Sequence, residues 1–413
     1  MLRVRLCIAV LVLLATSVTQ CHSQQLALHE GDRVVFYGDS ITAQRLYTRF
    51  VEDFFLTRYP QMHVTFWNAG VPGDTVYGGY TGDMPARIKR DVLPHQPTVV
   101  TIMLGMNDGY YMEFNQKYLD IYKEGYRKLW DALQSGVPAT RMILISPTPY
   151  DEITHGTEFV HYNDVVSRHS AFVKDLAASS HLAFSDFYHI ETDLLNEGTR
   201  SNPSLASMLI PDRIHPGEAS HWVMAAALAR SLGLSPVVCS VQLDARNVRT
   251  IKTENTEIVD LKANEGTLQW TQTDNALPLP LPLDDEMIQF VLGISDLAAM
   301  DRQMLSVSNL PAARYTLKID GHKIASFTRE QLSSGVNLAL SATPMESQAK
   351  GVDGIEIKRT KLDEARFILS VEDAKSDNAA SVMSAIETKV AALAAEQRKA
   401  AQPKPHRFEL SPE

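Results

Sequence analysis

The stretch Val34-Val35-Phe36-Tyr37-Gly38-Asp39-Ser40-Ile41-Thr42 decides the fold that we predict for this chain. It opens on a continuous apolar run, which is typical of a strand buried on both faces of a sheet. It then turns through a glycine and two polar residues directly into a helical pattern over residues 44–58. A buried strand followed by a helix is the first half of a β-α-β unit, so the stretch predicts a parallel sheet.

The same alternation of strand and helix continues from residue 33 to about residue 233. Five buried strands separated by helices predict an α/β fold in which a parallel sheet is covered on both faces. Ligands of such sheets bind at the carboxyl ends of the strands, so we expect function in the loops that follow the first three strands. The expected strands are 34–37, 64–67, 99–104, 142–145 and 182–184, and the expected helices are 44–58, 84–92, 116–134, 162–178 and 218–232.

The pattern changes after about residue 240. Short alternating stretches such as 315–319 predict strands, and Asp320-Gly321 predicts a tight hairpin turn because both positions favour positive φ. Leucine and proline alternate over residues 277–282, which indicates an extended linker or edge segment. We therefore predict three parts after the first 23 residues. They are an α/β domain over 24–238, a small β-rich accessory region over 239–375, and a C-terminal helix with a polar tail over 376–413.

Residues 1–23 have the three parts of a secretory signal peptide. Arg3 and Arg5 precede a short apolar run, and a polar stretch leads to a small residue at Ser23. The apolar run is too short to span a bilayer, which takes about 20 residues. We predict cleavage near Ser23 and a secreted protein, either periplasmic or extracellular. A lipid anchor at Cys21 is the alternative, although Gln20 is a poor neighbour for that signal.

The composition excludes several classes of protein. The chain has 413 residues, with 39 Lys and Arg against 49 Asp and Glu, a net charge of −10. An acidic surface argues against a nucleic-acid partner, which needs cations to displace counterions from phosphate. No apolar run after the signal peptide is long enough for a stable membrane span. Only Cys239 follows the signal peptide, so folding must rest on core burial and not on a disulfide.

A serine at the end of the first strand is a candidate nucleophile. The hydroxyl of Ser40 would project from the carboxyl edge of the sheet, where the N–H groups and the positive dipole end of the next helix also point. The alternative is that Asp39 and Ser40 only cap that helix, because both residue types are preferred N-caps. The motif alone does not decide between these readings.

A nucleophilic serine needs a base, and the base needs a group that orients it. Asp212 and His215 lie three residues apart just before the last helix, a spacing that can place the carboxylate beside Nδ1 of the imidazole. Asp186 and His189 have the same spacing just after the fifth strand. Spacing alone leaves the choice between the two pairs open.

Acyl transfer also needs hydrogen-bond donors at the place where the oxyanion forms. The turn Asn68-Ala69-Gly70-Val71-Pro72-Gly73 follows the second strand, and a glycine there offers an unobstructed N–H group. Leu104-Gly105-Met106-Asn107-Asp108 follows the third strand, where Asn107 can present its amide. Each stretch taken singly could be an ordinary turn, but their order along the chain favours a shared site.

Together, these motifs resemble those of the SGNH (GDSL) hydrolases. The matching motifs, in chain order, are Gly38-Asp39-Ser40, Asn68 to Gly73, Gly105 to Asp108, and Asp212-x-x-His215-Pro216. The resemblance covers about half of the chain and implies an esterase on a flavodoxin-like three-layer α/β/α sandwich. It implies Ser40 as nucleophile, His215 as general base and Asp212 as its orienter. The N–H groups of Ser40 and Gly73 and the amide of Asn107 would form the oxyanion hole.

Other side chains near these motifs are candidates for binding substrate. Met106 stands where many members of the family have glycine, which changes the wall of the acyl pocket. Tyrosines at 77, 80, 110 and 111 offer flat rings on which a sugar could stack, or they pack the loops. The candidates are Asp39, Tyr77, Tyr80, Met106 and Tyr110.

The sequence predicts no metal and no cofactor, because no histidine has a defensible metal-ligand spacing. We expect a secreted serine esterase that removes short acyl groups, in particular acetyl, from carbohydrate or another small ester. The first alternative is a lipolytic or thioester-cleaving hydrolase. The second is a non-catalytic glycan-binding protein on the same fold. The sequence leaves the oligomeric state open.

Overall fold

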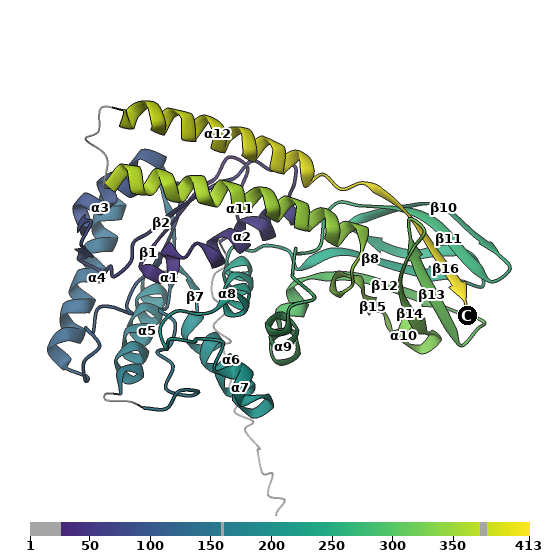
Figure 1. Cartoon of the computed structure of the whole chain (residues 1–413), viewed down its shortest axis with the longest axis horizontal. Coiled ribbons are helices and arrows are strands. Elements are labelled where there is room, and N and C mark those ends of the chain that lie inside the picture. Colours follow the sequence, from purple (N-terminus) through teal and green to yellow (C-terminus); the bar gives the residue numbers. More distant parts are fainter. Residues whose placement is uncertain (1–25, 158–160, 372–377) are drawn as a thin grey trace, which may run out of the picture.

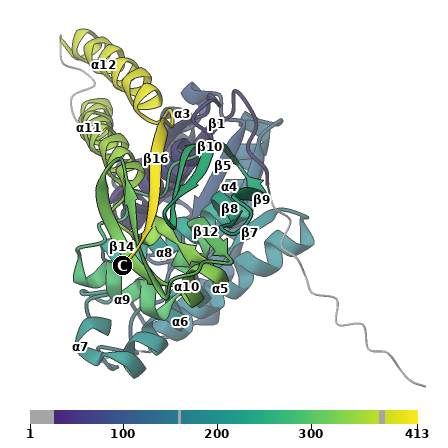
Figure 2. The same cartoon turned by 90° about the vertical axis from the view of Figure 1, so that its right-hand side faces the viewer.

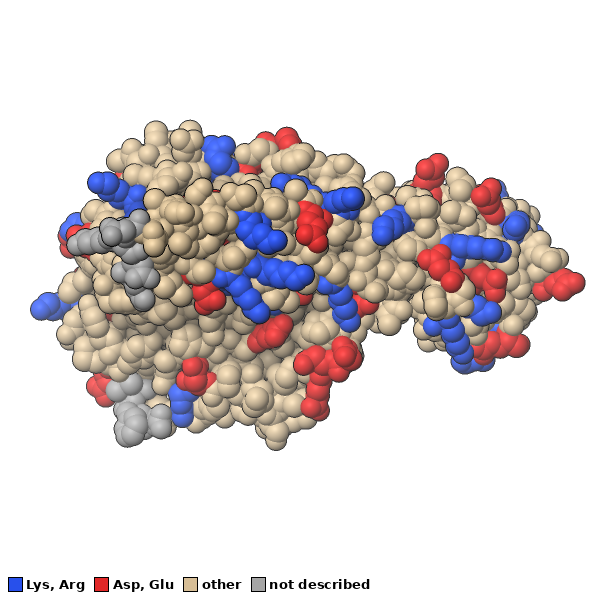
Figure 3. Space-filling model, turned by 45° about the horizontal axis from the view of Figure 1, so that its top comes forward, with Lys and Arg blue, Asp and Glu red and all other residues tan. Residues whose placement is uncertain are grey.

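The computed structural model describes residues 26–157, 161–371 and 378–413, and the predicted signal peptide lies outside them. An α/β lobe and a smaller β-rich lobe lie side by side, and two long helices run along one side of the α/β lobe (Figure 1). In Figure 3 the narrowing between the lobes is visible, and basic and acidic side chains are interspersed over the face shown.

The α/β lobe is built on a five-stranded parallel sheet with the order β2-β1-β5-β6-β7, which confirms the predicted fold class. The chain leaves β1 for one neighbour and returns to the other, so the sheet has its topological switch point beside β1. Gly38 at the end of β1 lies opposite both Gly70 and Met103, so the three following loops begin side by side. The strands are β1 (Arg33–Gly38), β2 (Thr65–Gly70), β5 (Val99–Met103), β6 (Arg141–Ile145) and β7 (Ala183–Ser185).

Helices cover both faces of this sheet. The apolar side chains of α3 and α4 and the C-terminal half of α5 share one buried cluster with alternate residues of the central strands. The side chains of α2 and α8 cluster on the opposite face, where Phe50 stacks on Trp222 at 3.8 Å between ring centroids. The helices are α2 (Leu46–Arg58), α3 (Met84–Asp91), α4 (Gln116–Gly136), α5 (Tyr162–Ser179) and α8 (Glu218–Ser231), and a small hairpin is formed by β3 (Gly78–Gly79) and β4 (Gly82–Asp83).

One helix of this lobe was not predicted. The segment after β7 forms α6 (Phe187–Ser201), which is followed by the single turn α7 (Pro203–Ala206). Asp186 is the N-cap of α6, and its carboxylate accepts the backbone N–H of His189 at 3.1 Å. His189 therefore lies in the first turn of a helix and not in a loop.

The β-rich lobe contains two sheets, of orders β10-β11-β16-β13-β14 and β15-β12-β8-β9. Trp270 and Phe408 stack at 5.1 Å in the buried cluster to which both sheets contribute. The predicted hairpin turn is confirmed, since φ is 50° at Asp320 and 83° at Gly321. The strands are β8 (Val237–Asp244), β9 (Arg249–Glu254), β10 (Thr256–Asn264), β11 (Thr267–Asp274), β12 (Arg302–Ser308), β13 (Arg314–Ile319), β14 (His322–Thr328), β15 (Val336–Asn337) and β16 (Pro405–Pro412), with the helices α9 (Glu286–Ile294) and α10 (Arg329–Ser334) between them.

The structure corrects the expected C-terminal organisation at two places. The region expected to be β-rich up to residue 375 includes the helix α11 (Pro344–Val371), which buries Met345, Ala349 and Val352 at helical spacing. The expected polar tail contains β16, because Phe408 and Leu410 alternate with polar residues and fill the lobe's core. The predicted C-terminal helix is present as α12 (Ala379–Ala400), and residues 376 and 377 lie outside the described part.

Buried polar contacts hold the lobes and long helices together. Arg58 at the end of α2 pairs with Asp301 at 2.5 Å, and both side chains are almost fully buried. The segment 277–282 lies in neither a helix nor a strand, and most of it is buried. Leu277 donates its N–H to the carbonyl of Thr57. Arg359 of α11 pairs with Glu52 of α2 (Figure 2 shows α11 and α12 from the end). Among the helices in described segments, none is long and apolar enough to cross a membrane.

Candidate active site

Ser40 is the first residue of the short helix α1 (Ser40–Ala43), which begins directly after β1. Asp39 caps this helix by accepting the N–H of Ile41 at 3.0 Å. α1 packs closely on the sheet, since a Cβ atom on Gly70 would lie 2.3 Å from the backbone nitrogen of Ala43. Close packing fixes the half-buried Ser40 at the carboxyl edge, where the switch point of the sheet also lies.

Ser40, His215 and Asp212 form a continuous hydrogen-bonded relay. His215 Nε2 lies 2.8 Å from Ser40 Oγ, and His215 Nδ1 lies 2.7 Å from Asp212 Oδ2. The carboxylate can only accept, so Nδ1 carries the proton and Nε2 is the free acceptor for the serine hydroxyl. The imidazole is therefore held in the tautomer that a general base needs.

The loop that carries the imidazole is held by backbone and side-chain contacts. Asp212 Oδ1 accepts the N–H groups of Ile214 at 3.0 Å and of His215 at 2.7 Å. Arg213 between them has a φ of 74°, and its guanidinium donates to the carbonyls of His155 and Gly156. An arginine whose backbone is held in the left-handed region, in a loop fixed by these hydrogen bonds, indicates that the position of His215 is strongly specified.

The charge state of Asp212 follows from the same contacts. Partial burial raises the pKa of this carboxyl, but hydrogen bonds from the backbone and ring of His215 and from Ile214 outweigh it, so that the pKa lies below its usual value. Asp212 is consequently ionised near neutral pH. Its negative charge can stabilise an imidazolium at His215.

Gly73 lies in the loop after β2, next to the serine. Val71 donates its N–H to the carbonyl of Gly38 at 3.0 Å, which ties the loop to the end of β1. Gly73 is exposed with a φ of 73°, a conformation that favours glycine. In the described part of the chain, the N–H groups of Gly73 and Ser40 donate to no other group. Both are available to a ligand.

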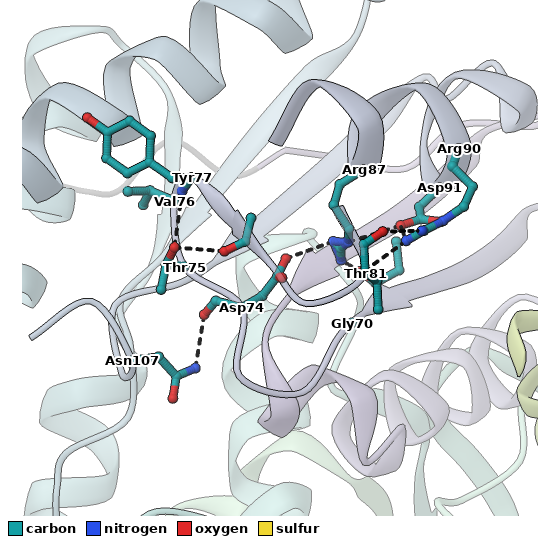
Figure 4. A network of polar contacts seen from close by, with 12 residues as sticks. Gly70, Asp74, Thr75, Val76, Tyr77, Thr81, Arg87, Arg90, Asp91 and Asn107 are labelled. Carbon is teal, nitrogen blue, oxygen red and sulfur yellow. Dashed lines mark hydrogen bonds and ion pairs between the residues drawn. The ribbon is translucent and has the colours of Figure 1, made fainter. Parts of the chain in front are cut away.

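A buried ion-pair network supports the loop that carries Gly73. Arg87 of α3 donates to Asp74 Oδ2 at 2.9 Å and to the carbonyl of Ala69, and it contacts Asp91 at 3.0 Å (Figure 4). Its guanidinium also lies over the ring of Tyr37 at 4.7 Å. Breaking one member would leave a buried charge unpaired, so the network resists movement of the loop.

Asn107 reaches the same edge from the loop after β5. Its Nδ2 donates to the carbonyl oxygen of Asp74 at 2.9 Å, as Figure 4 shows, and its Oδ1 accepts the hydroxyl of Tyr111 at 2.9 Å. One of the two Nδ2 hydrogens is used in these contacts. The other is left for a ligand.

Three carboxyl groups are buried near these loops. Burial raises the pKa of Asp39 to about 7 and of Asp108 to about 7. The charge of Asp74 adds to both increases, and the charge of Asp39 adds to the increase at Asp108. Burial also raises the pKa of Asp74 to about 6, although Arg87 opposes it. Asp108 accepts the N–H of Val76 at 3.0 Å and so links the two donor loops.

The second pair of equal spacing is also formed but lies elsewhere. His189 Nδ1 is 2.8 Å from Asp186 Oδ1, and Lys174 contacts the same carboxylate at 3.6 Å. β7, which precedes this pair, is three strands from β1, about 14 Å at the usual strand spacing. The structure thus brings Asp212 and His215 to Ser40, and not Asp186 and His189.

Two predicted substrate contacts are wrong. Asp39 is 1% exposed because its carboxylate is used as a helix cap, and Met106 is 0% exposed because its side chain joins the core cluster. Tyr77 packs against α4, where its hydroxyl donates to the carbonyl of Ile121. Tyr80 and Tyr110 are 73% and 56% exposed, and their contact with substrate stays a prediction.

Sequence reasoning missed the side chains that support the site. Arg87 follows Asp74 by 13 residues, and no motif connects the two. Tyr162 lies in α5, far along the chain from the loop after β5 that it holds. The hydroxyl of Tyr162 donates to the carbonyl of Met106 at 2.6 Å and accepts the N–H of Gly109 at 3.2 Å. Such contacts depend on tertiary structure, and no local pattern could have revealed them.

A serine hydroxyl, a correctly oriented imidazole and an ionised carboxylate, with unused donors on the neighbouring loops, can perform acyl transfer. Within the described segments, no group of three or more His, Cys, Asp or Glu residues is arranged to hold a metal ion. The α/β sheet and this constellation at its switch point define the class of serine hydrolases.

Comparison with known sequences gives the family. Residues 36–223 match the GDSL-like lipase/acylhydrolase family. The acetylxylan esterase of Geobacillus stearothermophilus is 26% identical over 229 residues, which cover 50% of this chain and 97% of that protein. Residues 36–223 therefore form a domain of the SGNH (GDSL) hydrolase family, and the chain is a serine hydrolase of carboxylic esters.

Two solved structures illustrate what this chain is similar to. A gut microbial diltiazem-metabolizing enzyme is 24% identical and superposes with a TM-score of 0.82 over 95% of this chain and 100% of that chain. The likeness includes the β-rich lobe, so the whole two-lobed fold occurs in a solved structure. The acetylxylan esterase of Geobacillus stearothermophilus is 26% identical and covers 50% of this chain and 97% of that chain, with a TM-score of 0.41.

Proposed function

We propose that this protein is a secreted esterase that removes short acyl groups, in particular acetyl, from carbohydrate. The observation that carries the proposal is the relay from Ser40 through His215 to Asp212, with contacts of 2.8 and 2.7 Å. In this proposal Ser40 is the nucleophile, His215 the general base and then acid, and Asp212 its orienter.

The reaction follows from these contacts. His215 takes the proton of Ser40 through Nε2 while Oγ attacks the ester carbonyl carbon. The N–H groups of Ser40 and Gly73 and the Asn107 amide stabilise the resulting oxyanion. The alkoxide then leaves with the proton from His215, and the acyl group stays on Ser40. Water, deprotonated by His215, attacks this acyl-enzyme and releases the acid.

Three observations support the short acyl group and the carbohydrate. A relative that is 26% identical over 229 residues is named an acetylxylan esterase. Met106 is buried and Tyr162 holds its carbonyl, so this part of the loop presents no flexible apolar side chain to a long acyl group. Tyr80 and Tyr110 are exposed on the two loops that carry the donors, where their rings can stack on a sugar.

The test compares acyl chain length on one leaving group. We expect faster hydrolysis of 4-nitrophenyl acetate than of the decanoate, and release of acetate from acetylated xylo-oligosaccharides. Preference for the decanoate would overturn the acyl assignment and favour a lipolytic enzyme. Failure to release acetate from any acetylated saccharide would overturn the carbohydrate assignment.

The nucleophile is tested separately by Ser40→Ala. Among the described residues, the Ser40 hydroxyl has a side-chain hydrogen bond only with His215, so the variant should melt like the wild type. Turnover should fall by about 10⁶-fold, as expected when the nucleophile of a triad is lost. Esterase activity equal to that of the wild type would show that the assigned roles are wrong.

The proposal of secretion rests on the signal-peptide pattern of residues 1–23 alone. Expression of the full chain with its own N-terminus, followed by N-terminal sequencing of the protein outside the cytoplasm, tests it. We expect a mature protein that begins close to residue 24. A full-length product that stays inside the cell would contradict secretion and leave the esterase assignment unaffected.

A further inference from the structure

The amide of Asn107 is held at both ends of its side chain. The Asp74 carbonyl accepts from Nδ2 at 2.9 Å, and the Tyr111 hydroxyl donates to Oδ1 at 2.9 Å. A single hydrogen bond would leave the amide free to turn about that contact. Two bonds at opposite ends fix its plane, and with it the direction of the remaining Nδ2 hydrogen.

Tyr111 is in a conformation that requires support. Tyr110 and Tyr111 have φ values of 53° and 55°, which is unusual for two consecutive bulky residues. The ring of Tyr111 packs on that of Tyr162 at 4.8 Å between centroids, and Tyr162 itself holds the loop through Met106 and Gly109. Strain that the surrounding structure maintains in this way is typical of functional sites.

The hydroxyl of Tyr111 is suited to act as a permanent donor. Partial burial of the phenol raises its pKa to about 12, and the charges of Asp39 and Asp212 contribute to this increase. A donor that stays protonated polarises the Asn107 amide and strengthens its second N–H as a donor.

We propose that Tyr111 is a positioning residue for the oxyanion hole, acting through Asn107. The proposal rests on the assignment of Asn107 as an oxyanion donor in the proposed function. Tyr111 itself does not touch the reacting atoms. It restricts the Asn107 amide to the orientation in which the free N–H faces the developing charge.

The variant Tyr111→Phe removes the hydroxyl and keeps the ring on Tyr162. We expect kcat for 4-nitrophenyl acetate to fall about 10-fold, because one hydrogen bond to the donor is lost, with KM little changed. Asn107→Ala, which removes the donor itself, should lower kcat about 100–1,000-fold. The loss from Tyr111→Phe is therefore smaller than that from Asn107→Ala.

The combination of the two variants separates positioning from a general structural role. In the Asn107→Ala background, Tyr111→Phe should cause no further loss of kcat, because its target is already gone. A further 10-fold loss in that background would overturn the proposal, since Tyr111 would then act by another route. Wild-type kcat in the Tyr111→Phe single variant would overturn it as well.

Tyr59→Phe is the matched control. The hydroxyl of Tyr59 accepts the N–H of Ser235 at 2.8 Å at the far end of α2, so its loss should affect stability and leave kcat unchanged. The same variants distinguish a failure of the proposed function from a failure of the role given to Tyr111. Esterase activity that does not depend on Ser40 would refute the proposed function. Ser40-dependent activity that Asn107→Ala lowers, but Tyr111→Phe does not, would refute the inference about Tyr111 alone.

Discussion

Asp186–His189 and Asp212–His215 contain the same residues at the same spacing, and both form an aspartate–imidazole contact. The distances are nearly equal, 2.8 Å for the first pair and 2.7 Å for the second. In the first pair the aspartate caps α6 at the edge of the sheet, and Lys174 contacts its carboxylate. In the second pair the imidazole reaches Ser40 at 2.8 Å.

The comparison shows that three-residue spacing produces a local hydrogen bond and nothing more. An imidazole becomes a base for Ser40 only if the fold places it beside the strand that carries the serine. The first pair follows β7 at one edge of the sheet, whereas the second lies before α8, and its imidazole reaches Ser40 directly after β1. The site thus depends on topology, and equal local geometry does not imply equal function.

The largest expected difference is between His215→Ala and His189→Ala. Loss of the base should lower kcat by about 10⁴–10⁶-fold, because Ser40 then has no group to take its proton. His189→Ala should leave kcat unchanged, since that ring is exposed and remote from the serine. Steady-state hydrolysis of 4-nitrophenyl acetate measures both. A large loss of kcat in His189→Ala would contradict the assignment of His215, and not His189, as the base.

A smaller difference is expected between the two aspartates. Asp212→Asn should lower kcat by about 10³–10⁴-fold, because the amide can no longer accept from Nδ1 as a carboxylate does and the tautomer is lost. Asp186→Asn should leave both kcat and stability close to wild type, since asparagine is an equally good N-cap. Equal kinetic constants for the two variants would show that Asp212 does not orient the base.

The smallest expected effect is on the pH dependence of stability, and it arises from a buried glutamate between α6 and α8. Glu191 of α6 is fully buried beside Ser220 of α8, and burial raises its pKa to about 8, against the opposing effect of the Ser220 hydroxyl. The native state keeps this proton after the unfolded chain has lost it, so stability should fall as the pH rises from 4.5 to about 8.

Chemical denaturation at a series of pH values measures this dependence. The free energy of unfolding of Glu191→Gln should fall less steeply over that range than that of the wild type. Other buried acids remain in the variant, so some slope is expected in both. The same slope in both proteins would show that Glu191 does not titrate between these pH values in the native state.

The sequence predicted the α/β lobe well because its signals are local. The strands of the sheet are short, largely apolar runs, and stretches of helical length separate them along the chain. The helix α6 could not be predicted from this stretch, because Asp-x-x-His fits a catalytic pair as well as it fits an N-cap, and in the structure Asp186 is the N-cap. The strand β16 was missed because only Phe408 and Leu410 mark it in a polar segment.

The candidate site could be predicted only as far as its motifs reach. Ser40, His215 and Asn107 stand in recognisable stretches, and the structure brings the first two into contact. Asp39 and Met106 belong to the same stretches, but whether they face solvent or the core depends on how α1 and the β5 loop pack. Tyr111 stands among the loop tyrosines that could stack on a sugar, but its contact with Asn107 has no sequence signal, because that hydrogen bond is formed across a strained turn.

Labelling with a fluorophosphonate probe tests the central claim most directly, because only an activated serine reacts at an appreciable rate. We predict that mass spectrometry will find the label on Ser40 in the wild type and in His189→Ala. The His215→Ala variant should remain unlabelled under the same conditions. Labelling of Ser40 at an undiminished rate in His215→Ala, or of another residue in its place, would contradict the account.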